Sequence, residues 1–154
     1  MNNYLESIKG KVVGYGKSSK EGFYDVYEYL EVKTADGVVK VVQNVAVNPN
    51  LNNEIGNAVA FKFADAKKFN SHYKYVFLCG LQKKNGYVLT DDRMLKAVYK
   101  AKYAIAYLSL IPPFTIISPF VFSKAKKLKQ AYEEIGQFDP LEPSFVSPTK
   151  RKRF

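Results

Sequence analysis

The feature that most limits how this chain folds is residues 103–123 (YAIAYLSLIPPFTIISPFVFS), a stretch of 21 residues without a charged side chain. A helix of about 20 apolar residues crosses a bilayer core of about 30 Å, so length alone permits a membrane span. Three prolines interrupt the stretch, and Pro112-Pro113 must break a helix because proline lacks an N–H donor and clashes with the preceding turn. The helical part before this break is only about 13 Å long at about 1.5 Å per residue.

Positive charge flanks the uncharged stretch on both sides. Four basic residues come just before it and four just after it: Arg93, Lys96, Lys100 and Lys102, then Lys124, Lys126, Lys127 and Lys129. Cytoplasmic loops of membrane proteins are enriched in Lys and Arg, so a single span would place one cluster on the wrong side. We therefore expect a hairpin that enters and leaves by the same leaflet. A single span and a soluble helix pair that covers one opening of a barrel are the alternatives.

Two sets of residues follow from the hairpin hypothesis. The expected membrane-embedded side chains are apolar or aromatic, with the two prolines: Tyr103, Ile105, Tyr107, Leu108, Leu110, Ile111, Pro112, Pro113, Phe114, Ile116, Ile117, Phe120 and Phe122. The expected contacts to a membrane surface or another polyanion are basic: Lys100, Lys102, Lys124, Lys126, Lys127, Lys129, Lys150, Arg151, Lys152 and Arg153. A basic amphipathic helix suits an anionic membrane surface.

The part of the chain before this stretch is typical of strands. Alternating apolar residues, with many valines and aromatics, predict six strand runs, at 9–15, 22–33, 38–47, 58–63, 73–82 and 87–90. Asp36-Gly37 and Asn85-Gly86 predict two tight hairpin turns, the second of type I′. Residues 48–57 (NPNLNNEIGN) are interpreted as a turn-rich loop. Short strands joined by turns indicate a small antiparallel β-barrel or sandwich, OB-like or SH3-like in size.

Helical periodicity begins after the strands. Thr90 is the expected N-cap of a first helix, with Asp91 and Asp92 placed against its dipole. A second helix is expected to start at Ser118-Pro119 and to run to Gly136. The predicted organisation is thus α+β: a β-rich domain (5–90), a proline-broken helical hairpin (91–136) and a flexible basic tail (137–154).

The residues that carry common enzyme chemistry are sparse in this chain. There is one cysteine, Cys79, and one histidine, His72, which excludes an intrachain disulfide and disfavours a zinc or di-iron site. Gly14–Ser18 (GYGKS) lacks the first glycine of the phosphate-loop pattern. We therefore expect a protein that is not an enzyme and has no cofactor. The first ten residues contain no apolar core of a signal peptide, so we expect a cytoplasmic location.

Residues 9–26 (KGKVVGYGKSSKEGFYDV) resemble the opening of a cold-shock or OB-type domain, which has a G-x-V strand followed by a lysine-glycine-aromatic strand. The resemblance implies nucleic-acid binding, with Phe23 and Tyr27 as the base-stacking side chains. Tyr24 replaces the second glycine of the family's RNA-binding strand, and the next strand, VVKVVQNVAV, lacks its aromatic-His-aromatic pattern.

Charge and hydropathy together suggest two functions. The chain has 24 Lys and Arg against 14 Asp and Glu, a net charge of +10. Our first hypothesis is a non-enzymatic module at the cytoplasmic face of the cell membrane, with an anionic membrane surface and a protein, including a second copy of itself, as partners. The second is a soluble, basic, OB-like protein of the cytoplasm that binds nucleic acid.

Overall fold

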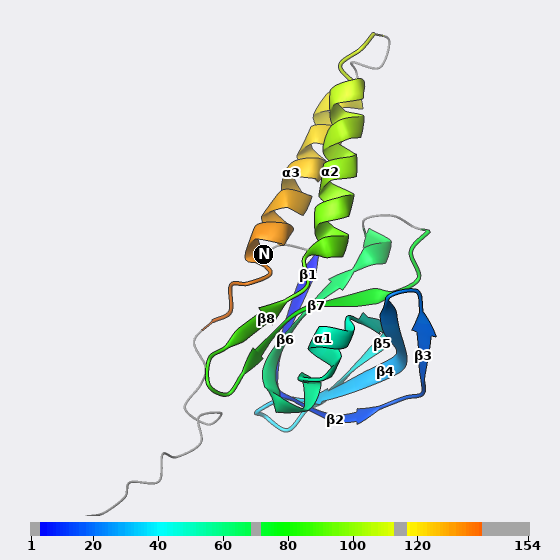
Figure 1. The fold of residues 1–154 in the computed structure, drawn as a ribbon. Helices are drawn as coiled ribbons and strands as arrows, with labels where there is room; N and C mark the ends of the chain where they lie inside the picture. Colours follow the sequence, from blue (N-terminus) through cyan, green and yellow to red (C-terminus); the bar gives the residue numbers. More distant parts are fainter. Residues whose placement is uncertain (1–3, 69–71, 113–116, 140–154) are drawn as a thin grey trace, which may run out of the picture.

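The computed structural model describes residues 4–68, 72–112 and 117–139, which form a mixed α+β fold (Figure 1). One eight-stranded sheet curls into a half-barrel, and two helices stand side by side on it and project away from it. The strands are β1 (Leu5–Lys9), β2 (Lys11–Tyr15), β3 (Ser18–Glu21), β4 (Tyr24–Lys33), β5 (Val39–Val47), β6 (Ala58–Asp65), β7 (Val76–Lys83) and β8 (Val88–Thr90). The helices are α1 (Pro49–Asn52), α2 (Arg93–Leu108) and α3 (Ser118–Glu134), with 3₁₀ turns η1 (Ile55–Asn57) and η2 (Ala66–Lys68).

The strands are ordered β1-β6-β7-β5-β4-β2, with β3 added beside β4 and β8 beside β7. Every pairing is antiparallel except that of β5 with β7, which is parallel and joins two residue pairs, Val45 with Val76 and Ala46 with Phe77. The prediction of a wholly antiparallel sheet is therefore wrong, and the sheet is mixed. The parallel pair arises because β5 and β7 are separated in the chain by β6, which crosses over to lie on the far side of β7.

Both predicted hairpins are confirmed, but the prediction of a type I′ turn at Asn85-Gly86 is wrong. The Gly86 N–H donates to the Lys83 carbonyl (2.9 Å), and the Lys83 N–H donates to the Tyr87 carbonyl (2.8 Å). Gly86 has a φ of +83°, whereas Asn85 does not have the positive φ that type I′ needs at its first central residue. The loop is thus a type I turn closed by a glycine bulge, and Thr34–Val38 repeats this pattern around Gly37.

The interval 48–57, predicted as a loop, contains α1 and η1 instead. Asn48 caps α1 by accepting a hydrogen bond from the Asn50 N–H (2.9 Å). Leu51 and Ile55 are buried in the interior of the half-barrel. These two apolar residues are spaced by four, but the asparagines around them hide the helical pattern.

Strands β4 and β5 exchange their faces midway along their length. On β4, Leu30 lies inside the half-barrel, whereas Val26, four residues earlier, faces the helices. On β5, Val42 and Val45 both pack on the interior side although they are three residues apart. The change occurs at Asn44, whose φ of +53° is unusual for a residue other than glycine. Strict alternation over residues 22–33 predicts Tyr24, Val26, Leu30 and Val32 on one face. The structure places Tyr24 and Val26 on the side of the helices and Leu30 and Val32 in the interior, so that prediction is wrong.

The chain has two apolar cores, one on each side of the curled sheet. The interior core is formed by residues of the sheet and of the α1–η1 segment, and it contains Phe61 and Phe63, whose rings stack with centroids 6.2 Å apart. The second core lies between the sheet and the helices, where Leu95 and Leu128 pack with Phe77. The helices are therefore attached to the outer face of the sheet by their lower halves.

The positions of the two long helices agree closely with their predicted bounds. Thr90, however, is the last residue of β8 and does not cap α2. The N-cap position is held by Asp92, and the carboxylate of Asp91 accepts a hydrogen bond from the Arg93 N–H (3.3 Å). The break at Pro112-Pro113 lies partly outside the described residues, because residues 113–116 are not among them.

Candidate functional site

Helices α2 and α3 run antiparallel and touch along their whole length. Tyr99 packs on Tyr132 near the sheet (centroids 5.1 Å apart), and Tyr107 packs on Phe122 near the free end (5.5 Å). The positions buried in the upper half of the pair are small: Ala106, Ser109, Ser118 and Ala125. The Ser109 hydroxyl donates to the carbonyl of Ala106 (2.6 Å), so its polar group is satisfied within the helix.

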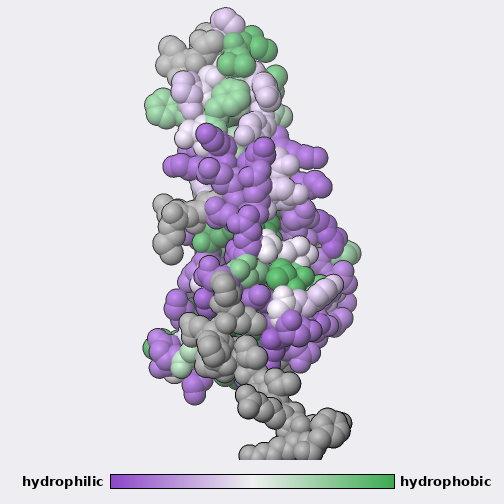
Figure 2. Space-filling model, turned by 90° about the vertical axis from the view of Figure 1, so that its left-hand side faces the viewer, coloured by the Kyte–Doolittle hydropathy of each residue, from purple (hydrophilic) through white to green (hydrophobic). Residues whose placement is uncertain are grey.

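Large apolar side chains at the free end of the hairpin point outward. We define the apolar tip as the seven large hydrophobic residues in the described part of this end that are between 49% and 74% exposed: Ile105, Tyr107, Leu108, Leu110, Ile111, Ile117 and Phe120. Figure 2 shows hydrophobic side chains gathered at this end of the molecule and a hydrophilic zone below them. A helix pair that ends in water normally buries its large apolar residues and exposes its small and polar ones. The tip has the reverse arrangement.

Most of the residues that the sequence nominated for membrane embedding come together at this tip. Phe120, the most exposed of those that the structure describes, is 74% exposed, and Pro112 is exposed as well. Tyr103 and Phe122 are half-buried, since each packs against a tyrosine of the pair. Pro113, Phe114 and Ile116 lie outside the described residues.

Below the tip, the lysine band comprises the six lysines nominated from the two helices: Lys100, Lys102, Lys124, Lys126, Lys127 and Lys129. All are exposed except Lys102, which is half-buried. The sequence from Arg93 to Tyr132 contains no acidic residue, and the first carboxylate after it, Glu133, pairs with Lys129 (3.6 Å). The other nominated basic residues, Lys150–Arg153, lie outside the described part of the chain.

A buried lysine ties α3 to the sheet. Lys62 of β6 is 8% exposed, and its ammonium group donates to the carbonyls of Glu134 and Gln137 at the end of α3. The ammonium also lies 5.0 Å from the centre of the Phe138 ring. Burial lowers the pKa of Lys62, while the carboxylates of Glu134 and Asp139 oppose that change. A cation here satisfies carbonyl groups that the helix leaves without partners.

A second polar cluster fixes the start of α2. The buried carboxylate of Asp91 accepts hydrogen bonds from the Asn48 amide (2.8 Å) and from the Arg93 guanidinium (3.2 Å). Asn48 itself caps α1, so one carboxylate joins both helices. The Arg93 guanidinium lies 4.6 Å from the centre of the Phe23 ring. Together with Lys62, this cluster holds the base of the hairpin at two points.

The two nominated base-stacking residues lie in different places. Phe23 is exposed beside Arg93, near the helices. Tyr27 packs against the interior core, and its hydroxyl donates to the side chain of Asn52 (2.7 Å). The structure therefore does not bring them together on one surface.

The single cysteine lies in the interior of the described structure. Cys79 is fully buried, and burial raises the pKa of its thiol. Within residues 4–68, 72–112 and 117–139, no cluster of three or more His, Cys, Asp or Glu side chains has a geometry suited to a metal ion.

We compared the chain with known proteins at three levels. No protein-family model, no curated protein and no solved structure matches it. Within the described part of the chain, none of the helices combines the length and the apolar character needed to cross a membrane.

Proposed function

We propose that this protein is a non-enzymatic module held at the cytoplasmic face of the cell membrane by the tip of its helical hairpin. In this proposal the apolar tip enters one leaflet, the lysine band contacts anionic headgroups, and the sheet domain remains in water to meet protein partners. The observation that carries the proposal is the outward orientation of large apolar side chains around a small-residue helix interface.

The dimensions of the hairpin fit a shallow insertion. The part of the tip within α2, Ile105 to Leu108, covers about 5 Å at about 1.5 Å per residue, less than the roughly 15 Å of one leaflet's hydrocarbon. Lys102 lies about 5 Å below Ile105 on α2, and Lys124 lies about 6 Å below Phe120 on α3. The headgroup layer is also about 5–7 Å thick, so these lysines reach it when the tip is in hydrocarbon.

Charge and apolar burial contribute separately to the proposed binding. Each lysine near an anionic leaflet contributes about 1 kcal/mol, an attraction that salt weakens. Burying a large apolar side chain contributes about 1.5–3 kcal/mol, and salt does not weaken it. We therefore expect anionic lipid to strengthen binding and high salt to reduce binding without abolishing it.

The test is flotation of the purified full-length protein with vesicles of phosphatidylcholine alone and with vesicles that also contain phosphatidylglycerol. We expect the protein to float with both, more strongly with the anionic vesicles, and to remain bound in part at about 1 M salt, where the screening length is about 3 Å. Phe120→Asp should weaken binding more than tenfold, since it removes about 2 kcal/mol of burial and adds a charge.

Val13→Asp is the matched control, because Val13 is an exposed apolar residue of β2, outside the hairpin. Its substitution should leave vesicle binding unchanged. Equal loss in both variants, or no flotation of the unmodified protein, would overturn the proposal.

Nucleic-acid binding is the second candidate function. Its support is the net charge of +10 and the exposed ring of Phe23, which lies next to the cation of Arg93. Binding of a single-stranded oligonucleotide should then fall steeply with salt and should weaken in Phe23→Ala. Oligonucleotide binding that is unaffected by Phe23→Ala would argue against this second function.

We also propose that the half-barrel is a small barrel of the OB-like or SH3-like kind. The support is its curl, its short strands and its interior core. In the hairpin, Pro112-Pro113 is proposed to set the bend, since neither proline can continue α2.

A further inference from the structure

One side of strand β5 is open over half of its length. β5 pairs with β4 from end to end, but it meets β7 only at Val45 and Ala46. At the other edge of the sheet, β1 pairs with β6 alone among the described strands. Within the described part of the chain, residues 39–43 therefore present an unpaired strand edge that faces the interior side of β1.

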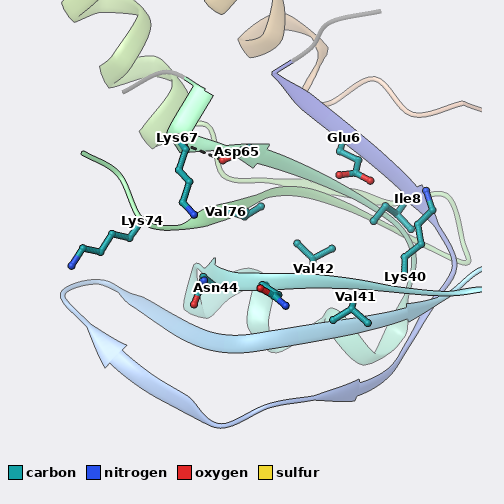
Figure 3. A pocket seen from close by; sticks show the side chains of 11 residues that line it. Glu6, Ile8, Lys40, Val41, Val42, Asn44, Asp65, Lys67, Lys74 and Val76 are labelled. Atoms are coloured by element: carbon teal, nitrogen blue, oxygen red, sulfur yellow. Dashed lines mark hydrogen bonds between the residues drawn. The ribbon is translucent and has the colours of Figure 1, made fainter. Parts of the chain in front are cut away.

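Three adjoining hollows form one groove along this edge. The middle hollow, about 440 Å³, lies between Ile8 of β1 and Lys40–Asn44 of β5 (Figure 3). It shares Ile8 and Lys40 with a hollow of about 440 Å³ beside the β4–β5 turn. It shares Asn44, Lys67 and Lys74 with a hollow of about 710 Å³ that reaches β3.

The backbone of β5 directs hydrogen-bonding groups toward this groove. The Thr34 N–H donates to the Val38 carbonyl (2.9 Å), which closes the β4–β5 hairpin. Hydrogen-bonded pairs alternate along an antiparallel ladder, so Lys40 and Val42 also bond to β4. Val39 and Val41, which lie between them, direct their N–H and carbonyl groups to the open side.

The side chains along the edge are apolar and exposed. Val38, Val39 and Val41 are between 46% and 55% exposed, although valine is among the residues most often buried. An unpaired edge with exposed valines is a template for another strand.

The middle hollow of the groove has lysines at both of its ends. Figure 3 places Lys67 and Lys74 at one end and Lys40 at the other. Among the described residues, neither Lys67 nor Lys74 forms an ion pair. The carboxylate of Asp65 accepts a hydrogen bond from the backbone N–H of Lys67 (3.1 Å), not from its ammonium group.

We propose that this groove binds an extended, acidic peptide segment of a partner protein, which pairs with β5 as an additional strand. The unpaired backbone of residues 39–43 supplies the main-chain hydrogen bonds, and the three lysines select acidic side chains on the peptide. This inference deepens the proposed function by giving the chemistry of the protein partner, and it rests on that part of the proposal.

A peptide fits this groove better than a nucleic acid does. Carboxylates line the groove as well as lysines: Glu6, Glu21, Glu28, Asp36 and Asp65. A phosphate backbone carries a negative charge at every residue, so it cannot follow the groove without meeting them. Tyr27 and Tyr75, its aromatic residues, are each held by a hydroxyl hydrogen bond, to Asn52 and to Glu21. An extended peptide, in contrast, can place its acidic residues opposite the lysines and its backbone along β5.

The experiment selects short random peptides displayed on phage against the full-length protein, without lipid. We expect the selected peptides to be rich in Asp, Glu and β-branched residues and poor in proline. Val41→Pro removes the N–H that faces the groove and should weaken their binding about tenfold or more, whereas Val41→Thr, which keeps the N–H, should not. Circular dichroism of both variants checks that the fold is retained.

Charge is tested separately. Lys67→Glu combined with Lys74→Glu should weaken peptide binding by about threefold to tenfold, and Lys84→Glu, on the distant β7–β8 turn, should leave it unchanged. The inference is overturned if no peptides are enriched, if Val41→Pro and Val41→Thr bind alike, or if an oligonucleotide displaces the peptides. Vesicle flotation of the same variants should be unchanged, so failure here is distinguishable from failure of membrane binding.

Discussion

At the scale of single residues, Lys62 shows how a charge can be buried usefully. Its ammonium group donates hydrogen bonds to the carbonyls of Glu134 and Gln137 in place of the water that burial removes. These bonds connect β6 to the end of α3. Lys62→Ala leaves these carbonyls without their donor and should lower the free energy of unfolding by about 2–3 kcal/mol. Lys9→Ala is the control, because Lys9 pairs with the exposed carboxylate of Asp139 (3.5 Å), and an ion pair at the surface should contribute little.

The same lysine predicts a pH dependence. Burial lowers the pKa of Lys62 in the folded state, so the unfolded chain binds more protons at this site at alkaline pH. The contribution of Lys62 to the free energy of unfolding therefore rises as pH increases from the folded pKa to the usual value of 10.5. The same contribution falls when pH is lowered through this range. We expect urea unfolding to show that, across this pH range, the free energy of unfolding of the unmodified protein increases relative to that of Lys62→Met. Parallel pH curves would contradict the prediction.

At the scale of elements, the hairpin depends on small residues between its helices. Ala106 is fully buried, and Ala104, two residues earlier on α2, is exposed. Ala106→Leu should separate the helices and lower the free energy of unfolding by about 1–3 kcal/mol through overpacking. Ala104→Leu adds the same side chain at an exposed position and should leave thermal unfolding nearly unchanged. If the two variants melt alike, the helices do not pack at Ala106 as described.

At the scale of the whole molecule, the two cores predict how far the sheet domain depends on the helices. The interior core contains no residue of α2 or α3. The second core, between the sheet and the helices, loses Leu95, Val98, Leu128 and Ile135 when the helices are removed. Residues 1–92 alone should therefore keep a β-type circular dichroism spectrum, but with several kcal/mol less stability, since each buried apolar side chain contributes about 1.5–3 kcal/mol.

This truncated chain should also bind a hydrophobic dye at its uncovered outer face and should no longer float with vesicles. A random-coil spectrum would show that the sheet needs the helices to fold. Flotation that persists without the hairpin would place the membrane contact elsewhere.

The sequence by itself determined the features that depend on local chemistry. The glycines of Asp36-Gly37 and Asn85-Gly86 marked both hairpin turns, because glycine adopts positive φ without strain. Helical periodicity and proline located α2 and α3, since these signals act within a few residues. The apolar tip follows from an uncharged stretch that is visible in the sequence. The membrane and nucleic-acid functions stay predictions.

Only the tertiary structure decided the features that depend on distant partners. The burial of Leu51 and Ile55 needs the interior of the half-barrel, and the exchange of faces places the two ends of β4 against different cores. Which face of each helix points outward at the tip is set by contacts such as Tyr107 with Phe122. The open edge of β5 exists because β7 pairs with only two of its residues. Strand partners lie far apart in the chain, so local sequence patterns do not specify which edges stay open.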